Sequence, residues 1–217
     1  MKVIAFMTQK GGTGKTTLAA SVGVAAQQAG ERVFLIDLDP QGSLSSWGER
    51  REAETPGVDK INPDKLSAAL QGLERAGYTL GIIDTQGVDS AATSAAMRVA
   101  DLSLIPARPS ALDIEASRPT LAALDRLKRP VAFVLNQCPP GRNARPHDAS
   151  KALSLLGVLA LPFIGQRTDH QDALASGLGV TEFEPEGKAA DEIRQLWHWI
   201  NRKVEGKAHG QASASLA

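Results

Sequence analysis

The sequence predicts an α/β fold: a single doubly wound domain with a mostly parallel sheet flanked by helices. Six short apolar runs have the length of β-strands, and most of them lack the polar–apolar alternation of half-exposed strands. Helix-length segments separate these runs, and alternating strands and helices are typical of parallel sheets covered on both faces. The expected strands are Val3–Met7, Val33–Ile36, Leu80–Asp84, Leu102–Pro106, Val131–Asn136 and Val158–Pro162.

The segments between the expected strands are long enough for helices. Gly30 suits the position just after a helix end, where a left-handed residue is favoured. In the last expected helix the apolar residues recur on one face. We expect this face to pack on the domain, and a membrane-surface helix is the alternative. The expected helices are Lys15–Ala29, Pro63–Ala76, Ser90–Val99, Asp113–Leu127, Asp148–Leu156 and Glu192–Val204.

Composition limits the class of protein. With 217 residues, of which 42% are hydrophobic, the chain can bury a sizeable core. We expect one domain over residues 1–206 and a disordered tail over 207–217, which is rich in Ala, Ser and Gly. Basic and acidic residues balance at 24 each, so no overall field selects nucleic acid or membrane. The single cysteine, Cys138, excludes an internal disulfide and suits a reducing cytoplasm. We expect neither a signal peptide nor a bilayer-spanning segment, which would need ~20 apolar residues.

A glycine-rich loop between the first expected strand and the first expected helix carries the strongest functional signal. Glycines there let backbone N–H groups curl around phosphate oxygens, and the helix dipole favours the phosphate charge. Lys15 is expected to reach the β- and γ-phosphates, and the Thr16 hydroxyl is expected to bind Mg²⁺. The loop, expected to bind a nucleotide, consists of Lys10, Gly11, Gly12, Thr13, Gly14, Lys15, Thr16 and Thr17, with a second lysine at its first position.

Asp84 ends an apolar expected strand, where a buried carboxylate is costly unless it serves a partner. We expect it to hold Mg²⁺, through a coordinated water; a role in capping the next turn is the alternative. Asp37 and Asp39 follow another apolar strand. Because the carboxyl ends of parallel strands meet at one edge of a sheet, these carboxylates and the loop should converge on one site.

The two-lysine loop resembles the deviant Walker A motif of the ParA/MinD family of P-loop ATPases. Residues 37–41 look like the first switch of this family, and residues 82–87 look like its Walker B strand and second switch. Residues 108–113 match a loop common in the partition branch, and residues 41–47 are similar to small single-domain partition ATPases such as ParF. Two departures are Gln86-Gly87 in place of paired prolines, and a charge at Arg108 that the sequence does not explain.

The resemblance implies roles for residues that geometry alone does not assign. The residue at the Asp39 position orients the attacking water, and the one at Asp37 supports the metal shell; a turn role for Asp39-Pro40 stays open. Lys10 is implied to reach across a dimer interface to the phosphates of the partner, as an arginine finger does. No Gln or His is evident for activating water, so we expect slow turnover. The expected catalytic residues are Lys10, Lys15 and Asp39, and the expected metal residues are Thr16, Asp37 and Asp84.

Asn136 ends the fifth expected strand, where its amide could read the edge of adenine; a turn role is the alternative. The GTPase signature is absent, since Gln137 follows Asn136, and this favours ATP as the nucleotide.

A local excess of basic residues between positions 118 and 151 is the candidate DNA surface. Seven basic residues stand there against two acidic ones, which suits sequence-independent contacts with phosphates. Many basic surface helices bind nothing, so that alternative stays open. The candidate DNA-contacting residues are Arg142, Arg145, Lys151 and Arg167.

The favoured function is an ATP-dependent homodimeric switch with slow hydrolysis that binds nucleoid DNA non-specifically. It would partition a plasmid or chromosome with a ParB-like partner, or another adaptor, that stimulates hydrolysis. One alternative is a MinD-like ATPase that cycles on the membrane; another is an ATPase that positions a protein assembly, such as a chemoreceptor cluster or a microcompartment. Three other classes fit the sequence less well. A metabolic enzyme would need a second substrate pocket. A nitrogenase-like reductase would need two cysteines in each chain, and a tyrosine kinase would need a cluster of tyrosines. We expect a cytoplasmic, nucleoid-associated protein.

Overall fold

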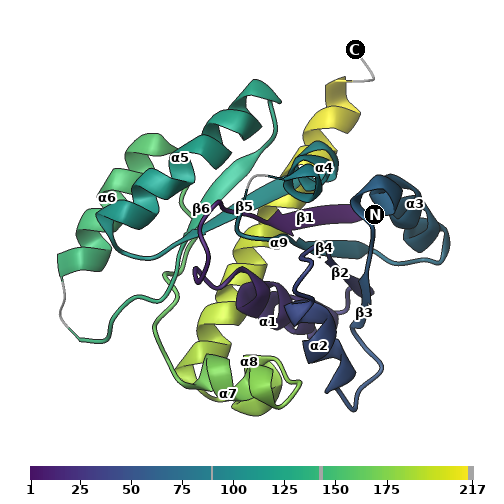
Figure 1. The fold of residues 1–217 in the computed structure, drawn as a ribbon, viewed down its shortest axis with the longest axis horizontal. Coiled ribbons are helices and arrows are strands. Elements are labelled where there is room, and N and C mark those ends of the chain that lie inside the picture. Colours follow the sequence, from purple (N-terminus) through teal and green to yellow (C-terminus); the bar gives the residue numbers. More distant parts are fainter. Residues whose placement is uncertain (89, 142–143, 215–217) are drawn as a thin grey trace.

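The computed structural model describes residues 1–88, 90–141 and 144–214. In this part of the chain a six-stranded, fully parallel sheet lies between two layers of helices (Figure 1), so the expected fold class is confirmed. The strands are β1 Lys2–Phe6, β2 Val33–Asp37, β3 Gly57–Lys60, β4 Leu80–Asp84, β5 Leu102–Ala107 and β6 Val131–Leu135.

The order of the strands, β3-β2-β4-β1-β5-β6, puts β1 inside the sheet with β4 on one side and β5 on the other. The chain builds β2, β3 and β4 on one side of β1, and then crosses over to build β5 and β6 on the other side. Ligands of open parallel sheets bind at the carboxyl ends of strands, where the order reverses in this way. The segment after β1, which is the phosphate-binding loop, lies at that point.

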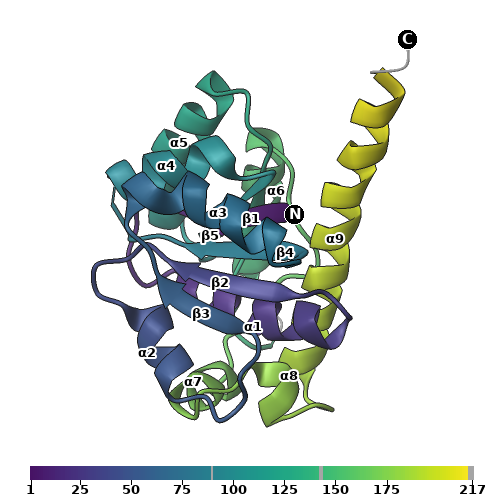
Figure 2. The same cartoon turned by 90° about the vertical axis from the view of Figure 1, so that its right-hand side faces the viewer.

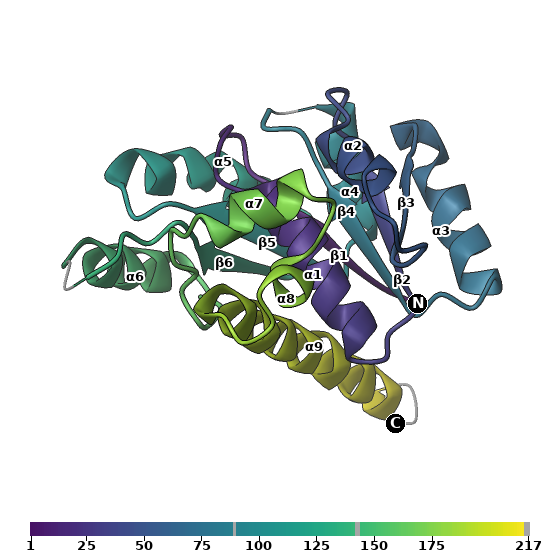
Figure 3. The same ribbon diagram turned by 90° about the horizontal axis from the view of Figure 1, so that it is seen from below.

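Two groups of helices bury the two faces of the sheet (Figures 2 and 3). Alternate strand residues point to opposite faces, so Ile4 and Phe6 join one core while Val3 and Ala5 join the other. The first core is covered by α1 Lys15–Gln28, α2 Ser43–Glu49, α7 Asp169–Ala175, α8 Val180–Phe183 and α9 Lys188–Ala214. The second is covered by α3 Leu66–Arg75, which follows the 3₁₀ turn Pro63–Lys65, and by α4 Ala91–Val99, α5 Ala111–Arg126 and α6 Ala144–Leu156.

One expected strand is wrong, and one strand was not predicted. Residues 158–162 make only an isolated bridge, between Leu159 and Phe133 of β6. Val158 and Leu161 are exposed, so the apolar character of this run does not reflect a buried strand. The unpredicted strand is β3, which pairs with β2 at the edge of the sheet. It is short, half-exposed and partly charged, and therefore lacks the apolar signal of the inner strands.

Helix α9 confirms the expected packing of the C-terminal apolar face. The five residues of that face are buried in the first core: Ile193, Leu196, Trp197, Ile200 and Val204. The helix continues to Ala214, through part of the stretch expected to be a tail, while residues 215–217 lie outside the described residues. The domain boundary at residue 206 stays a prediction. None of the described helices is both long and apolar enough to cross a membrane.

Candidate nucleotide and magnesium site

The phosphate-binding loop joins the buried end of β1 to the start of α1. Gly14 adopts φ +89°, and a Cβ atom there would lie 2.4 Å from Nδ2 of Asn136, so the position admits no side chain. A Cβ atom on Gly87 would lie 3.0 Å from the backbone nitrogen of Gly11. The second switch therefore lies directly against the loop, and a side chain at residue 87 would crowd the loop backbone.

At the inner end of the loop, Lys15 and Thr16 meet Asp84 at the end of β4. The Thr16 hydroxyl donates a hydrogen bond to Oδ2 of Asp84 at 2.6 Å. Asp84 is completely buried, and this burial, helped by the nearby charges of Asp37 and Asp39, raises its pKa to about 7 against the opposing Thr16 and Lys15. Burial also lowers the pKa of Lys15, although Asp84 and Asp39 oppose that shift. The structure thus brings together five of the six expected catalytic and metal residues, all but Lys10.

The donor set of this inner end fits Mg²⁺. Oδ1 of Asp84 is buried and has no hydrogen-bond partner, so a buried carboxylate carries a lone pair that nothing in the chain uses. The described residues contain no group of three or more His, Cys, Asp or Glu side chains arranged to hold a metal. Mg²⁺ at a phosphate needs no such cage, because one or two protein oxygens, waters and the phosphates complete its shell. Asp84 and Thr16 would hold the ion, which would neutralise phosphate charge.

Asp37 and Asp39 are already engaged with the backbone that follows β2. Asp37 accepts hydrogen bonds from the backbone N–H groups of Asp39, at 2.9 Å, and Ser45, at 2.8 Å, and from the Ser45 hydroxyl at 2.9 Å. Oδ1 of Asp39 accepts from the backbone N–H of Gln41 at 2.9 Å, which is the turn role left open by the sequence. Asp37 therefore ties the first switch to the start of α2. Its metal role, and the water-orienting role of Asp39, stay predictions.

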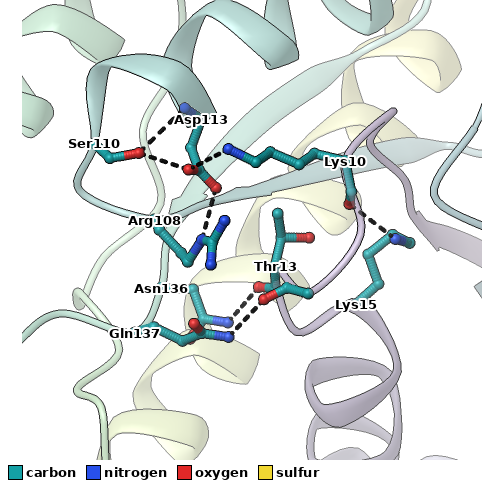
Figure 4. Close-up of polar contacts among 9 residues, drawn as sticks. Lys10, Thr13, Lys15, Arg108, Ser110, Asp113, Asn136 and Gln137 are labelled. Carbon is teal, nitrogen blue, oxygen red and sulfur yellow. Dashed lines mark hydrogen bonds and ion pairs between the residues drawn. The ribbon is translucent and has the colours of Figure 1, made fainter.

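At the outer end of the loop, Lys10 turns away from Lys15 and toward α5 (Figure 4). Nζ of Lys15 lies 3.4 Å from the carbonyl oxygen of Lys10, whereas Nζ of Lys10 donates to Oδ2 of Asp113 at 2.8 Å. Nε of Arg108 donates to Oδ1 of the same carboxylate at 2.9 Å, and the Ser110 hydroxyl donates to Oδ2 at 2.6 Å. This cluster accounts for the charge at Arg108. The sequence signal at Asp113 is only a helix-start pattern, Ser110-x-x-Asp113, so its contact with Lys10 was missed.

Asn136 braces the loop in this structure. Its Nδ2 donates to the carbonyl oxygen of Thr13 at 2.8 Å, and Nε2 of Gln137 donates to the carbonyl oxygen of Gly12 at 3.0 Å. Figure 4 shows both amides directed at the loop backbone. A role for Asn136 in reading adenine stays a prediction, and the brace by Gln137 was not foreseen.

The four candidate DNA-contacting residues do not share one environment. Arg145 and Lys151 are exposed on α6. Arg167 is half-buried and pairs with Oε1 of Glu192 on α9 at 2.5 Å, so a DNA contact would compete with this ion pair. Arg142 lies outside the described residues. DNA binding by these residues stays a prediction.

Comparisons with known proteins agree with this geometry. The family model of the CobQ/CobB/MinD/ParA nucleotide binding domain matches residues 4–180. Maintenance of carboxysome distribution protein A from Gloeobacter kilaueensis is 34% identical over 213 residues, with 94% of each chain covered. The protein of the same name from Halothiobacillus neapolitanus is 31% identical over 205 residues, covering 89% of this chain and 93% of the relative.

A solved structure extends the comparison to the fold. The septum site-determining protein MinD from Pyrococcus horikoshii, complexed with Mg-ADP, superposes with a TM-score of 0.75 at 18% identity, over 93% of this chain and 96% of that one. The two sequence relatives are named for carboxysome distribution, so the likeness to the ParF branch in particular is not supported. With a family model matched over most of its length, the chain belongs to the CobQ/CobB/MinD/ParA nucleotide binding domain family and is a P-loop ATPase of the ParA/MinD type.

Proposed function

We propose that this chain is an ATP-dependent dimerising switch that distributes a large protein assembly within the cell. The observation that carries the proposal is the direction of Lys10, whose ammonium lies at the outer rim of the loop and away from Lys15 (Figure 4). A cation at the rim does not serve the phosphates of its own chain, and we infer that it acts on the phosphates of a second copy. ATP would then be part of the dimer interface, and hydrolysis would separate the two chains.

Within each chain the inner end of the loop would do the chemistry. Lys15 lies at the phosphate-binding turn and Thr16 lies beside Asp84, and this arrangement supports Lys15 as the phosphate ligand and Thr16 and Asp84 as the magnesium ligands. Asp39, in the turn after β2, would orient the attacking water. Its carboxylate has one oxygen in a turn hydrogen bond, which leaves the other for a water molecule.

The cargo we favour is a protein assembly, which the sequence had placed second to a plasmid or chromosome. Two relatives that align over about nine-tenths of this chain are named for carboxysome distribution, and this supports an assembly of that kind. A partner protein on the assembly would stimulate hydrolysis, which is the role that the sequence analysis expects of a ParB-like partner or another adaptor. Membrane cycling is less well supported, because the apolar face of α9 is buried in the domain.

Nucleoid DNA is the proposed track. Arg145 and Lys151 supply exposed positive charge on α6, and a dimer would double it, so affinity for DNA would depend on ATP. The contacts would be with phosphates and without sequence preference, which makes binding weaken steeply with salt.

The test is to compare the wild type with Lys10→Ala in nucleotide binding, dimerisation and binding to random-sequence DNA, with Mg-ATP and Mg-ADP over a salt series. We expect Lys10→Ala to keep nucleotide affinity and to lose both ATP-dependent dimers and ATP-dependent DNA binding. Lys65→Ala, which removes an exposed lysine beside α3, is the matched control and should behave as the wild type. Normal dimers in Lys10→Ala with ATP would overturn the proposal.

A further inference from the structure

Lys10, at the rim of the loop, is not a free cation, because it forms an ion pair with the buried carboxylate of Asp113 in the same chain. We propose that Asp113 is a positioning residue for Lys10, which it binds in the monomer and must give up when a second chain joins. The inference rests on the proposed function, because it assumes that Lys10 acts on the phosphates of a partner. It adds that dimerisation is an exchange of one anion for another at Lys10.

The geometry of the contact is specific. The side chain of Asp113 is 2% exposed, whereas that of Lys10 is 27% exposed, so a half-open lysine reaches into a closed carboxylate site. Ser110 caps the start of α5 and also donates to Asp113, which fixes the orientation of the carboxylate. Residues 10 and 113 are far apart in the sequence. The contact joins the phosphate-binding loop, which follows β1, to the start of α5, which follows the neighbouring strand β5.

Arg108 makes release of Lys10 feasible. Burial on its own would raise the pKa of Asp113, but hydrogen bonds from Arg108, Lys10 and Ser110 outweigh it and hold the pKa at about 2. When Lys10 leaves, Arg108 and Ser110 still satisfy the carboxylate, so no unpaired charge is left buried. Without Arg108, release of Lys10 would leave the buried carboxylate of Asp113 without a cation. Asp113 would therefore bind Lys10 more tightly.

The two neighbours of Lys10 therefore have opposite effects on its freedom. Neutralising Asp113 should free Lys10, whereas removing Arg108 should confine it. A residue that merely stabilised this corner of the fold would not produce effects of opposite sign on one lysine. For a charge pair half-open to solvent we expect changes of about three- to tenfold in each direction.

The first measurement is the reactivity of Lys10 in the nucleotide-free protein, as acetylation by limiting acetic anhydride, quantified by mass spectrometry against Lys65 in the same molecule. We expect Asp113→Asn to raise the labelling of Lys10 about three- to tenfold and Arg108→Gln to lower it. Glu115→Gln, which changes the charge of an exposed side chain on the same helix, is the control and should leave the labelling unchanged. Unchanged labelling in Asp113→Asn would overturn the inference.

The second measurement is dimerisation of the same proteins with Mg²⁺ and a non-hydrolysable ATP analogue, by sedimentation. We expect Asp113→Asn to form dimers at a concentration about three- to tenfold lower than the wild type, and Arg108→Gln at a higher one. Dimers of equal strength in all variants would overturn the exchange. Absence of dimers from every protein, wild type included, would contradict the proposed function instead, while the labelling would still test the hold of Asp113 on Lys10. If Asp113→Asn fails to fold, the Arg108→Gln arm decides in both measurements.

Discussion

The two ends of the phosphate-binding loop each face a buried carboxylate, and the two carboxylates behave in opposite ways. Asp84, at the inner end, is completely buried, and its pKa is raised to about 7. Asp113, at the outer end, is almost equally buried, and its pKa is lowered to about 2. Burial alone therefore does not determine the charge of either group.

The difference lies in what each carboxylate receives. Asp113 receives hydrogen bonds from two cations and a hydroxyl, so its negative charge is matched within the chain. Asp84 receives one hydroxyl, has a second oxygen without a partner, and lies near two further aspartates. The inner carboxylate thus keeps one oxygen without a hydrogen-bond partner, whereas the outer carboxylate is satisfied by groups of the same chain.

The largest expected effect is on the pH dependence of stability at the inner end. Folded Asp84 keeps its proton up to about pH 7, whereas the unfolded carboxyl loses its proton near 3.8, so the folded state binds more protons between these values. Stability therefore falls as pH rises through this window, by about 4 kcal/mol from this group. Urea denaturation of the metal-free protein should show the fall in the wild type and not in Asp84→Asn. Asp59→Asn, on the exposed edge strand β3, is the control, and a parallel fall in Asp84→Asn would contradict the assignment.

The same substitution at the outer end should have the opposite sign. The folded pKa of Asp113 lies below its unfolded value, so its contribution to stability is present above about pH 4 and is lost as pH falls through about 2. At pH 7 we expect Asp113→Asn to cost about 1 kcal/mol, because Lys10 and Arg108 are partly open to solvent and their charges are screened, while Asp84→Asn stabilises the metal-free protein. Denaturation at pH 7 measures both. Equal signs would show that the two carboxylates do not differ as described.

The smallest expected effect concerns the braces of the loop between the two carboxylates. Asn136→Ala removes a buried hydrogen bond to the carbonyl oxygen of Thr13 and should cost about 1 kcal/mol. Gln137→Ala removes a similar but exposed bond to Gly12 and should cost about 0.5 kcal/mol or less. Thermal denaturation compares the two variants. A larger loss for Gln137→Ala would mean that the exposed amide is the main brace.

Local patterns predicted the inner end of the site well. A glycine loop after an apolar strand, and an aspartate at the end of another, suffice because parallel strands bring their carboxyl ends together. The structure places Thr16 and Asp84 in contact, as this reasoning requires. The apolar runs likewise predicted the four inner strands and the edge strand β6, since a buried parallel strand has few polar residues.

The outer end could not be predicted in the same way. The pairing of Lys10 with Asp113 depends on two segments 103 residues apart, and the local pattern around Asp113 indicates only the start of a helix. β3 was missed because an exposed edge strand has no apolar signal. Residues 158–162 were predicted as a strand because a run of apolar residues looks like a buried strand even when some of its side chains are exposed. The first case depended on a tertiary contact, and the other two on the exposure of side chains; neither leaves a periodic trace in the sequence.

The position of β1 inside the sheet has a consequence for synthesis of the chain. Most of the nucleotide motif emerges from the ribosome within the first 16 residues, but β1 is paired on both sides only after residues 80–84 and 102–107 have emerged. The brace from Asn136 comes later still. At ordinary translation speeds the motif waits on the order of ten seconds for these partners. A nascent chain therefore carries the phosphate-binding loop well before the strands and the brace that support the loop have emerged.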